Sequence, residues 1–157
     1  MTRRNHRCRR DDGAVLVEFA IIAPLLFAIL FGIIEFGWGY AQYLDARHGA
    51  REGARLAAVD YSDPTISPPS TGATQTQQIL EEVCERMGGD VNSAMVTLAY
   101  DNTANTDLGD RASINVTAEL DTLTGFLDFA LGGVQIEDDI SFRLERDSSW
   151  TDGNLTC

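Results

Sequence analysis

Residues 14–34, AVLVEFAIIAPLLFAILFGII, decide the fold, and Glu18 is their one charged residue. As an α-helix, this stretch would measure about 30 Å, which matches the hydrocarbon core of a bilayer. Core helices of soluble proteins rarely stay so apolar beyond about 14 residues. The stretch therefore predicts a membrane-spanning helix, with the span extending over residues 14–36.

The charges on the two sides of this stretch predict its orientation. Residues 1–13 contain five Arg and two Asp, whereas residues 14–157 contain seven Arg and 22 acidic residues. Basic segments stay on the cytoplasmic side of a membrane, so we expect a cytoplasmic leader over residues 1–13 and an extracytoplasmic body. Phe36, Trp38, Tyr40 and Tyr43 follow the apolar stretch 14–34 as an aromatic belt would, and we expect Glu35 beside them to be solvated.

A removable secretory signal is the alternative for the N-terminal region. The apolar run is longer than the core of most signals, and no A-x-A-like cleavage site follows it. Twin arginines occur at residues 3–4 and 9–10, but the residues after each pair do not favour a twin-arginine signal. We therefore expect the helix to be retained.

Composition argues against several classes of protein. A net charge of −12 over 157 residues disfavours a nucleic-acid partner. Two distant His and no CxxC pair predict no metal site, and the acidic turn from residue 101 has Thr106 and Ala112 where a calcium loop needs Gly and Glu. No nucleotide fingerprint occurs, and His48 has no indicated Ser or Cys partner, so we expect neither enzyme activity nor a cofactor.

A cleavage motif precedes the apolar run. The string from Gly13 through Ala14 and Glu18 to Phe19, GAVLVEF, resembles the processing site of type IV pilin-like prepilins. The wider stretch over residues 13–37, together with AREGAR at residues 50–55, resembles the TadE-like family. Members of this family are pilin-like (pseudopilin) proteins of the tight-adherence (Flp) pilus/secretion system. The resemblance is specific over residues 13–60 and weak beyond them.

This resemblance implies a role for each unusual residue near the cut. A prepilin peptidase would cleave after Gly13, whose missing side chain lets an enzyme approach its carbonyl, and would leave Ala14 as the new N-terminus. Glu18 would then pair with the Ala14 amine of a neighbouring pilin-like subunit; the alternative is a carboxylate that reaches back to head-group water. Pro24 frees a helix carbonyl and predicts a local kink. A membrane assembly platform would be a further partner.

A helical stem is predicted over residues 37–61. Small residues spaced three and four apart form one stripe that would let another helix approach closely: Ala46, Gly49, Ala50, Gly53, Ala54, Ala57 and Ala58. The stripe packs either against a neighbouring subunit or under the chain's own C-terminal domain. Arg47, Arg51 and Arg55 form a basic ridge that either docks carboxylates or stays solvated.

A linker rich in Pro, Ser and Thr over residues 62–74 leads to an extracytoplasmic domain over residues 75–157. Periodicity predicts a helix over residues 76–87 and strands over 94–100, 111–120 and 134–144, with a bulge at Asp138–Asp139. Residues 122–131 read as a short helix or an apolar crossover. The fold class is therefore α+β, with a three-stranded antiparallel sheet after the long helix.

Two of the three cysteines would share the oxidising side of the membrane. Cys84 and Cys157 lie in the predicted outer domain, whereas Cys8 lies in the leader. They form either a disulfide or two free thiols, with Cys84 inert and buried on its helix.

Two functions from different classes remain. The first is a structural pilin-like subunit of pilus assembly or secretion, located in the cell membrane as a single-pass protein or in a surface filament. The second is a single-pass anchor whose outer domain binds a ligand or partner as a monomer. Cleavage after Gly13 discriminates between them, because a simple anchor needs no such step.

Overall fold

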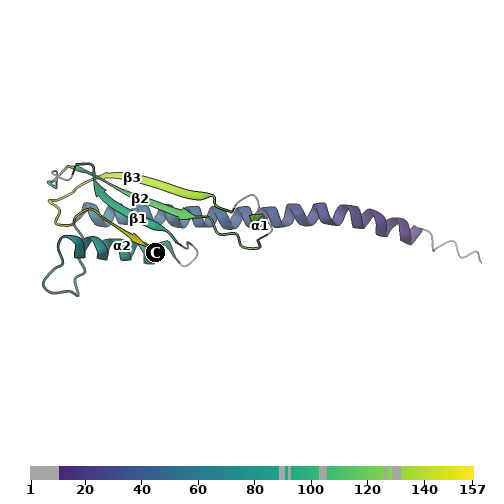
Figure 1. The fold of residues 1–157 in the computed structure, drawn as a ribbon, viewed down its shortest axis with the longest axis horizontal. Helices are drawn as coiled ribbons and strands as arrows, with labels where there is room; N and C mark the ends of the chain where they lie inside the picture. Colours follow the sequence, from purple (N-terminus) through teal and green to yellow (C-terminus); the bar gives the residue numbers. More distant parts are fainter. Residues whose placement is uncertain (1–10, 89–90, 92, 103–105, 126, 129–131) are drawn as a thin grey trace, which may run out of the picture.

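The computed structural model describes residues 11–157 except 89–90, 92, 103–105, 126 and 129–131. The arginines of the leader, Cys8, and part of the predicted 122–131 element lie outside the described residues. The described chain is α+β, as predicted, with a long helix, a second helix and one antiparallel sheet (Figure 1).

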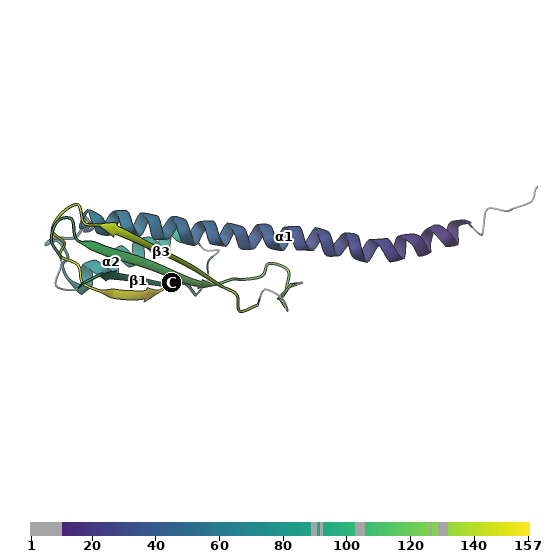
Figure 2. The same ribbon diagram turned by 90° about the horizontal axis from the view of Figure 1, so that it is seen from above.

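Helix α1, Asp11–Ala58, has 48 residues and is therefore about 72 Å long. It continues through Pro24, and its ribbon bends in the N-terminal third (Figure 2). Its C-terminal half lies beside the sheet, whereas its N-terminal half extends away from the rest of the chain (Figures 1 and 2). The helix ends three residues earlier than the predicted stem, because Asp60 adopts a positive φ of 54°.

Helix α2, Ala73–Met87, confirms the predicted amphipathic helix and starts three residues earlier than expected. Its buried apolar residues are Ile79, Leu80, Val83 and Met87. Gly88 ends it with a φ of 78°, a conformation that costs glycine little.

The sheet contains the three predicted strands, β1 (Met95–Tyr100), β2 (Arg111–Glu119) and β3 (Gln135–Arg143). The predicted count of three was wrong, because β4 (Gly153–Thr156) adds a fourth strand next to β1. The spatial order is β3-β2-β1-β4, and every neighbouring pair is antiparallel. The fourth strand is short and contains Gly and Asn, which are uncommon in strands, so its sequence gave little signal.

The predicted bulge at Asp138–Asp139 was also wrong. The pairing of β2 with β3 is continuous, with Val116 opposite Asp138 and Asn115 opposite Asp139. Asp138 therefore occupies the same alternating position as Ile136 and Ile140 rather than a bulge. One of its carboxylate oxygens is buried without a hydrogen-bond partner among the described residues.

The core lies between the sheet and the two helices. The inward residues of β2, which include Ile114 and Val116, are fully buried, and their neighbours in sequence face out. Trp150 closes one end of this core: its ring stacks on Tyr100 at a centroid distance of 3.9 Å, and its Nε1 donates a hydrogen bond to the Ala57 carbonyl. This arrangement ties the C-terminal region to the end of α1.

Candidate membrane and assembly segment

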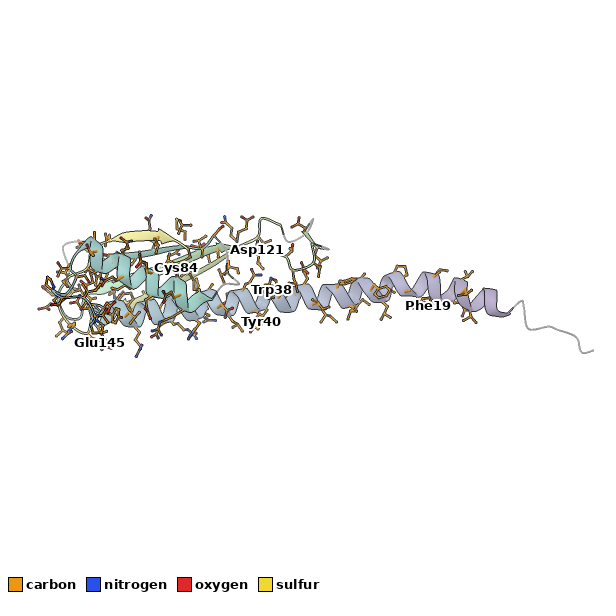
Figure 3. The ribbon with its side chains drawn as sticks, turned by 90° about the horizontal axis from the view of Figure 1, so that it is seen from below. Phe19, Trp38, Tyr40, Cys84, Asp121 and Glu145 are labelled. Carbon is orange, nitrogen blue, oxygen red and sulfur yellow. A yellow bond between two sulfur atoms is a disulfide. The ribbon has the colours of Figure 1, made fainter. Side chains whose placement is uncertain are left out.

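The N-terminal half of α1 presents an apolar surface that nothing else in the described structure covers. Only 6% of its most apolar 18-residue stretch is buried. The exposed fractions of Leu16, Phe19 and Ile21 are 68%, 63% and 71%. Phe19 lies far from the folded domain (Figure 3). By length and composition, α1 is long and apolar enough to cross a membrane. Such an exposed surface is stable in contact with lipid and unstable in water.

The predicted cleavage motif lies at the start of this surface. A Cβ atom on Gly13 would have no neighbour within 4 Å, so packing within the chain does not require a glycine there. Glu18 is exposed on the same helix, and the three ion pairs found among the described residues all lie elsewhere, within the C-terminal half of α1, within α2 or between these two helices.

The stripe of small residues packs inside the chain. Ala46, Ala50 and Ala57 are fully buried. A Cβ atom on Gly49 would lie 2.2 Å from Met87 Cγ, and one on Gly53 would lie 2.5 Å from both Ile114 Cδ1 and Val83 Cγ2. Of the two interpretations of the stripe, the structure shows packing under the chain's own domain, which leaves these residues no free surface for a neighbouring helix.

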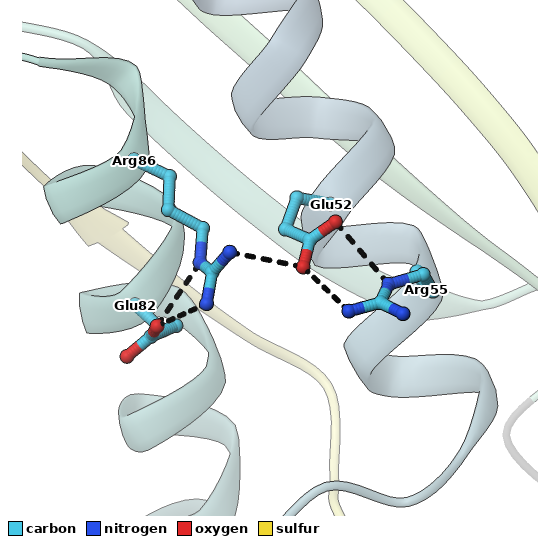
Figure 4. Close-up of polar contacts among 4 residues, drawn as sticks. All are labelled: Glu52, Arg55, Glu82 and Arg86. Carbon is cyan, nitrogen blue, oxygen red and sulfur yellow. Dashed lines mark hydrogen bonds and ion pairs between the residues drawn. The ribbon is translucent and has the colours of Figure 1, made fainter.

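The predicted basic ridge is divided among different contacts. Arg55 pairs with Glu52 at 2.9 Å, and Glu52 also accepts from Arg86 of α2 at 3.0 Å (Figure 4). The hydrogen bond from Arg55 lowers the pKa of the Glu52 carboxyl, and the positive charges of Arg55 and Arg86 lower it further. Glu52, which was not singled out from the sequence, thus joins α1 to α2.

The other two ridge residues, Arg47 and Arg51, take no part in the ion pairs of Glu52. Arg47 donates a hydrogen bond to the Tyr43 hydroxyl at 3.3 Å, and Arg51 is exposed. Among the described residues, neither forms an ion pair with a carboxylate.

Two polar residues on one face of α1 hold the connection between β2 and β3. Gln42 donates to the Asp121 carbonyl at 2.8 Å and accepts from the Asp121 amide at 3.0 Å. Glu35 accepts hydrogen bonds from the Thr124 amide at 3.2 Å and from its hydroxyl at 2.8 Å. The expectation that water solvates Glu35 was wrong, because the residue is only 1% exposed. The seven-residue spacing places both side chains on one helix face and was the signal available in the sequence.

An apolar groove lies beside these contacts, between α1 and the start of β3. Its volume is about 400 Å³, and its lining includes Phe36, Tyr40, Tyr43, Leu120 and Ile136. Phe36 and Tyr40 are 75% and 54% exposed and stack on each other at 6.4 Å. Three of the four residues of the predicted aromatic belt, Phe36, Tyr40 and Tyr43, therefore line this groove at the edge of the folded domain.

Cys84 and Cys157 form a disulfide with their Cα atoms 5.5 Å apart. The bond joins α2 to the residue after β4, and the Cys157 amide also donates to the Ala94 carbonyl at 2.7 Å. The C-terminus is thus attached to α2 and to the residue that precedes β1.

Comparison with known proteins finds a similarity for the helix that carries these features. Residues 13–55 match the family model of the TadE-like protein. This segment is similar to TadE-like proteins. The match begins at Gly13 and ends at Arg55, so it includes the apolar surface, Glu18, both stripe glycines and the basic ridge. The TadE-like family is a structural, pilus-associated family, and the match confirms the resemblance found in the sequence. No curated protein and no solved structure matches the chain.

Proposed function

We propose that this chain is a TadE-like minor pilin or pseudopilin, a structural subunit of tight-adherence pilus assembly or secretion. The observation that carries the proposal is the TadE-like match beginning at Gly13, on a helix whose apolar half projects away from the domain. A projecting apolar helix with a folded, disulfide-bonded outer domain is a suitable shape for a subunit that is stored in a bilayer and packed by its helix.

The proposal includes processing after Gly13 by a prepilin peptidase on the cytoplasmic side. Gly13 has no packing role within the chain, since an added Cβ would meet nothing within 4 Å. Its place before the apolar run supports recognition by a peptidase instead. The outer domain, residues 59–157, would then lie outside the cytoplasm, where its disulfide is stable.

The intact mass of the protein extracted from membranes tests this proposal. In a cell with a working prepilin peptidase, we expect the mass of residues 14–157, and we expect Gly13→Leu to retain the leader because the added side chain blocks access to the scissile carbonyl. Gly32→Ala is the matched control, since a Cβ there also meets nothing within 4 Å, and it should be processed normally. A wild-type protein that keeps residues 1–13 would favour the uncleaved single-pass anchor.

A further inference from the structure

The connection between β2 and β3 is described at residues 120–125, 127–128 and 132–134, and these residues lie at the level where the span would leave the membrane. Glu35 follows Ala14 by 21 residues, which is about 31 Å along the helix axis and equals the thickness of a bilayer core. Its hydrogen bonds to Thr124 hold the connection at that level. The Gln42–Asp121 contacts lie seven residues, or about 10 Å, further from the span.

The connection therefore descends along α1 toward the apolar half of the helix. Asp121 is held beside Gln42 and Thr124 beside Glu35, so the direction is set by two contacts rather than by one. Figure 2 shows the same arrangement: the described residues of this connection extend further toward the N-terminal end of α1 than the strands do. The opposite end of the domain, where Leu108 lies in the turn between β1 and β2, is near the C-terminal end of the helix, because the Leu144 carbonyl accepts from the Gly109 amide and the next residue donates to the Ala58 carbonyl.

The side chains at this level are apolar and exposed. Leu123 and Val134 on the connection are 53% and 40% exposed, and Phe36 and Tyr40 on the helix are 75% and 54% exposed. They continue the exposed apolar surface of the span, which includes Ile33 at 66%. The apolar groove runs between the two elements. In water this surface would be unfavourable, whereas in the head-group layer such side chains are stable.

From this geometry we infer that Phe36, Tyr40, Leu123 and Val134 form a lipid-docking surface that rests in the outer head-group layer. This inference rests on the membrane insertion in the proposed function. The surface fixes the height and tilt of the outer domain above the bilayer. Two elements, α1 and the connection between β2 and β3, enter the head-group layer on different sides of the groove, so the domain is held at two places. Glu35 is a positioning residue: its buried carboxylate holds Thr124 at the membrane level.

The charges near the surface specify the kind of lipid. Among the described residues, the charged side chains at this end of the sheet and on the connection are acidic: Glu119, Asp121, Asp128 and Glu137. The three arginines of the ridge begin only at Arg47. An anionic membrane surface repels such an arrangement. The docking surface therefore fits a zwitterionic lipid layer and holds to it by apolar contact.

Depth-dependent fluorescence quenching of the full chain in phosphatidylcholine vesicles tests the inference, with lipids brominated at shallow or deep positions. In a Trp38→Phe background, Trp150 remains but is only 2% exposed and lies in the domain core. We expect Leu123→Trp to be quenched several-fold more by shallow than by deep bromines. Leu108→Trp is the matched control: Leu108 is 66% exposed at the other end of the domain, and we expect no quenching there.

Leu25→Trp separates this inference from the proposed function, since deep bromines should quench it whenever the span is inserted. Quenching at residue 25 without quenching at residue 123 would overturn lipid docking and leave insertion intact. Failure at both positions would overturn both. Quenching of Leu123→Trp that appears only when the protein is diluted in lipid would also contradict the inference. It would mean that a second copy, rather than lipid, covers the surface at higher protein density. Adding Glu35→Ala should reduce the quenching of Leu123→Trp by shallow bromines. It should leave the quenching of Leu25→Trp by deep bromines unchanged.

The head-group preference has its own measurement. Mixing phosphatidylglycerol into the vesicles should weaken the quenching of Leu123→Trp, and salt should restore it. Stronger quenching in the anionic vesicles would overturn the assignment to a zwitterionic layer.

Discussion

Gly53 of α1 lies so close to Val83 of α2 that no side chain fits between the two helices. A Cβ atom added to Gly53 would be 2.5 Å from Val83 Cγ2, and the same atom would be 2.5 Å from Ile114 Cδ1. Val83 is β-branched and fully buried, so it has little freedom to move away. The glycine therefore sets the distance between α1, α2 and the sheet.

Gly53→Ala should destabilise the outer domain. Overpacking a core costs about 1–3 kcal/mol, and the better helix propensity of Ala returns up to about 1 kcal/mol of it. We expect a net loss of about 1–2 kcal/mol in the free energy of unfolding, measured by urea denaturation of the full chain in detergent.

Gly37→Ala is the control for helix propensity. It lies on the same helix, but an added Cβ there meets nothing within 4 Å. This variant should be as stable as the wild type or slightly more stable. Equal effects of the two substitutions would show that the close approach at Gly53 is unimportant.

The Cys84–Cys157 disulfide should contribute strongly to stability. The two residues are 73 positions apart, and the chain-entropy model gives about 4 kcal/mol for closing a loop of this length. Cys84→Ser should therefore lower the free energy of unfolding by about that amount and leave one free thiol in the outer domain. Non-reducing gel mobility and thiol titration measure the bond directly. Two titratable outer thiols in the untreated wild type would contradict the pairing.

Glu52 should make stability depend on pH in the acidic range. Its pKa is lowered below the ordinary value of 4.5 because Arg55 donates a hydrogen bond to its carboxylate and Arg55 and Arg86 place positive charge nearby. A lowered pKa in the folded state contributes stability above pH 4.5 that is lost as the pH falls through the folded value. The contribution is at most about 1 kcal/mol, as for other pairs near the surface.

The comparison of Glu52→Gln with the wild type isolates this effect. The variant should be less stable at pH 7, and the difference should disappear well below pH 4. Glu85→Gln on α2 is the matched control, because Glu85 is exposed and forms no ion pair with the described residues. A difference for Glu52→Gln that persists at low pH would show that packing, rather than charge, explains it.

The elements with a strong period could be predicted from the sequence. Residues 14–34, the amphipathic face of α2 and the alternation in β1 to β3 each repeat a pattern that local geometry fixes. The fourth strand was missed because its four residues form a strand only through pairing with β1 and anchoring by the disulfide. Such pairing depends on contacts between distant parts of the chain.

The same reason explains the errors about single side chains. Glu35 was expected at a wet interface, because the sequence does not show that Thr124, 89 residues away, covers it. The bulge at Asp138 was predicted because an inward carboxylate breaks the apolar alternation, yet the backbone register continues through it. The stripe of small residues was recognised, but which surface it packs against depended on the position of α2 and the sheet.

Glu18 tests the proposed assembly mechanism most directly. Cleavage after Gly13 would create an α-amine on Ala14, with a pKa near 8 in a reference peptide, four residues or about 6 Å before Glu18 along the helix axis. A neighbouring subunit shifted by about one turn would place its amine beside this carboxylate. In a low dielectric, each charge without a partner is costly, so the pair would select one axial offset between subunits.

We expect Glu18→Ala and Glu18→Gln to be inserted and largely cleaved but to fail in assembly, with Glu18→Gln nearly as defective because it keeps the shape and loses the charge. Glu35→Gln is unsuitable as a control, because Glu35 is buried and holds Thr124. Glu145→Gln is the better one: Glu145 is exposed at the far end of the domain (Figure 3), and its loss of charge should leave assembly unchanged. Intact mass measures cleavage, and recovery of the subunit in sheared surface filaments or crosslinked complexes measures assembly. Normal assembly by Glu18→Gln would show that the subunits find their offset without this charge, and the register would then have to come from the shape of the apolar helix.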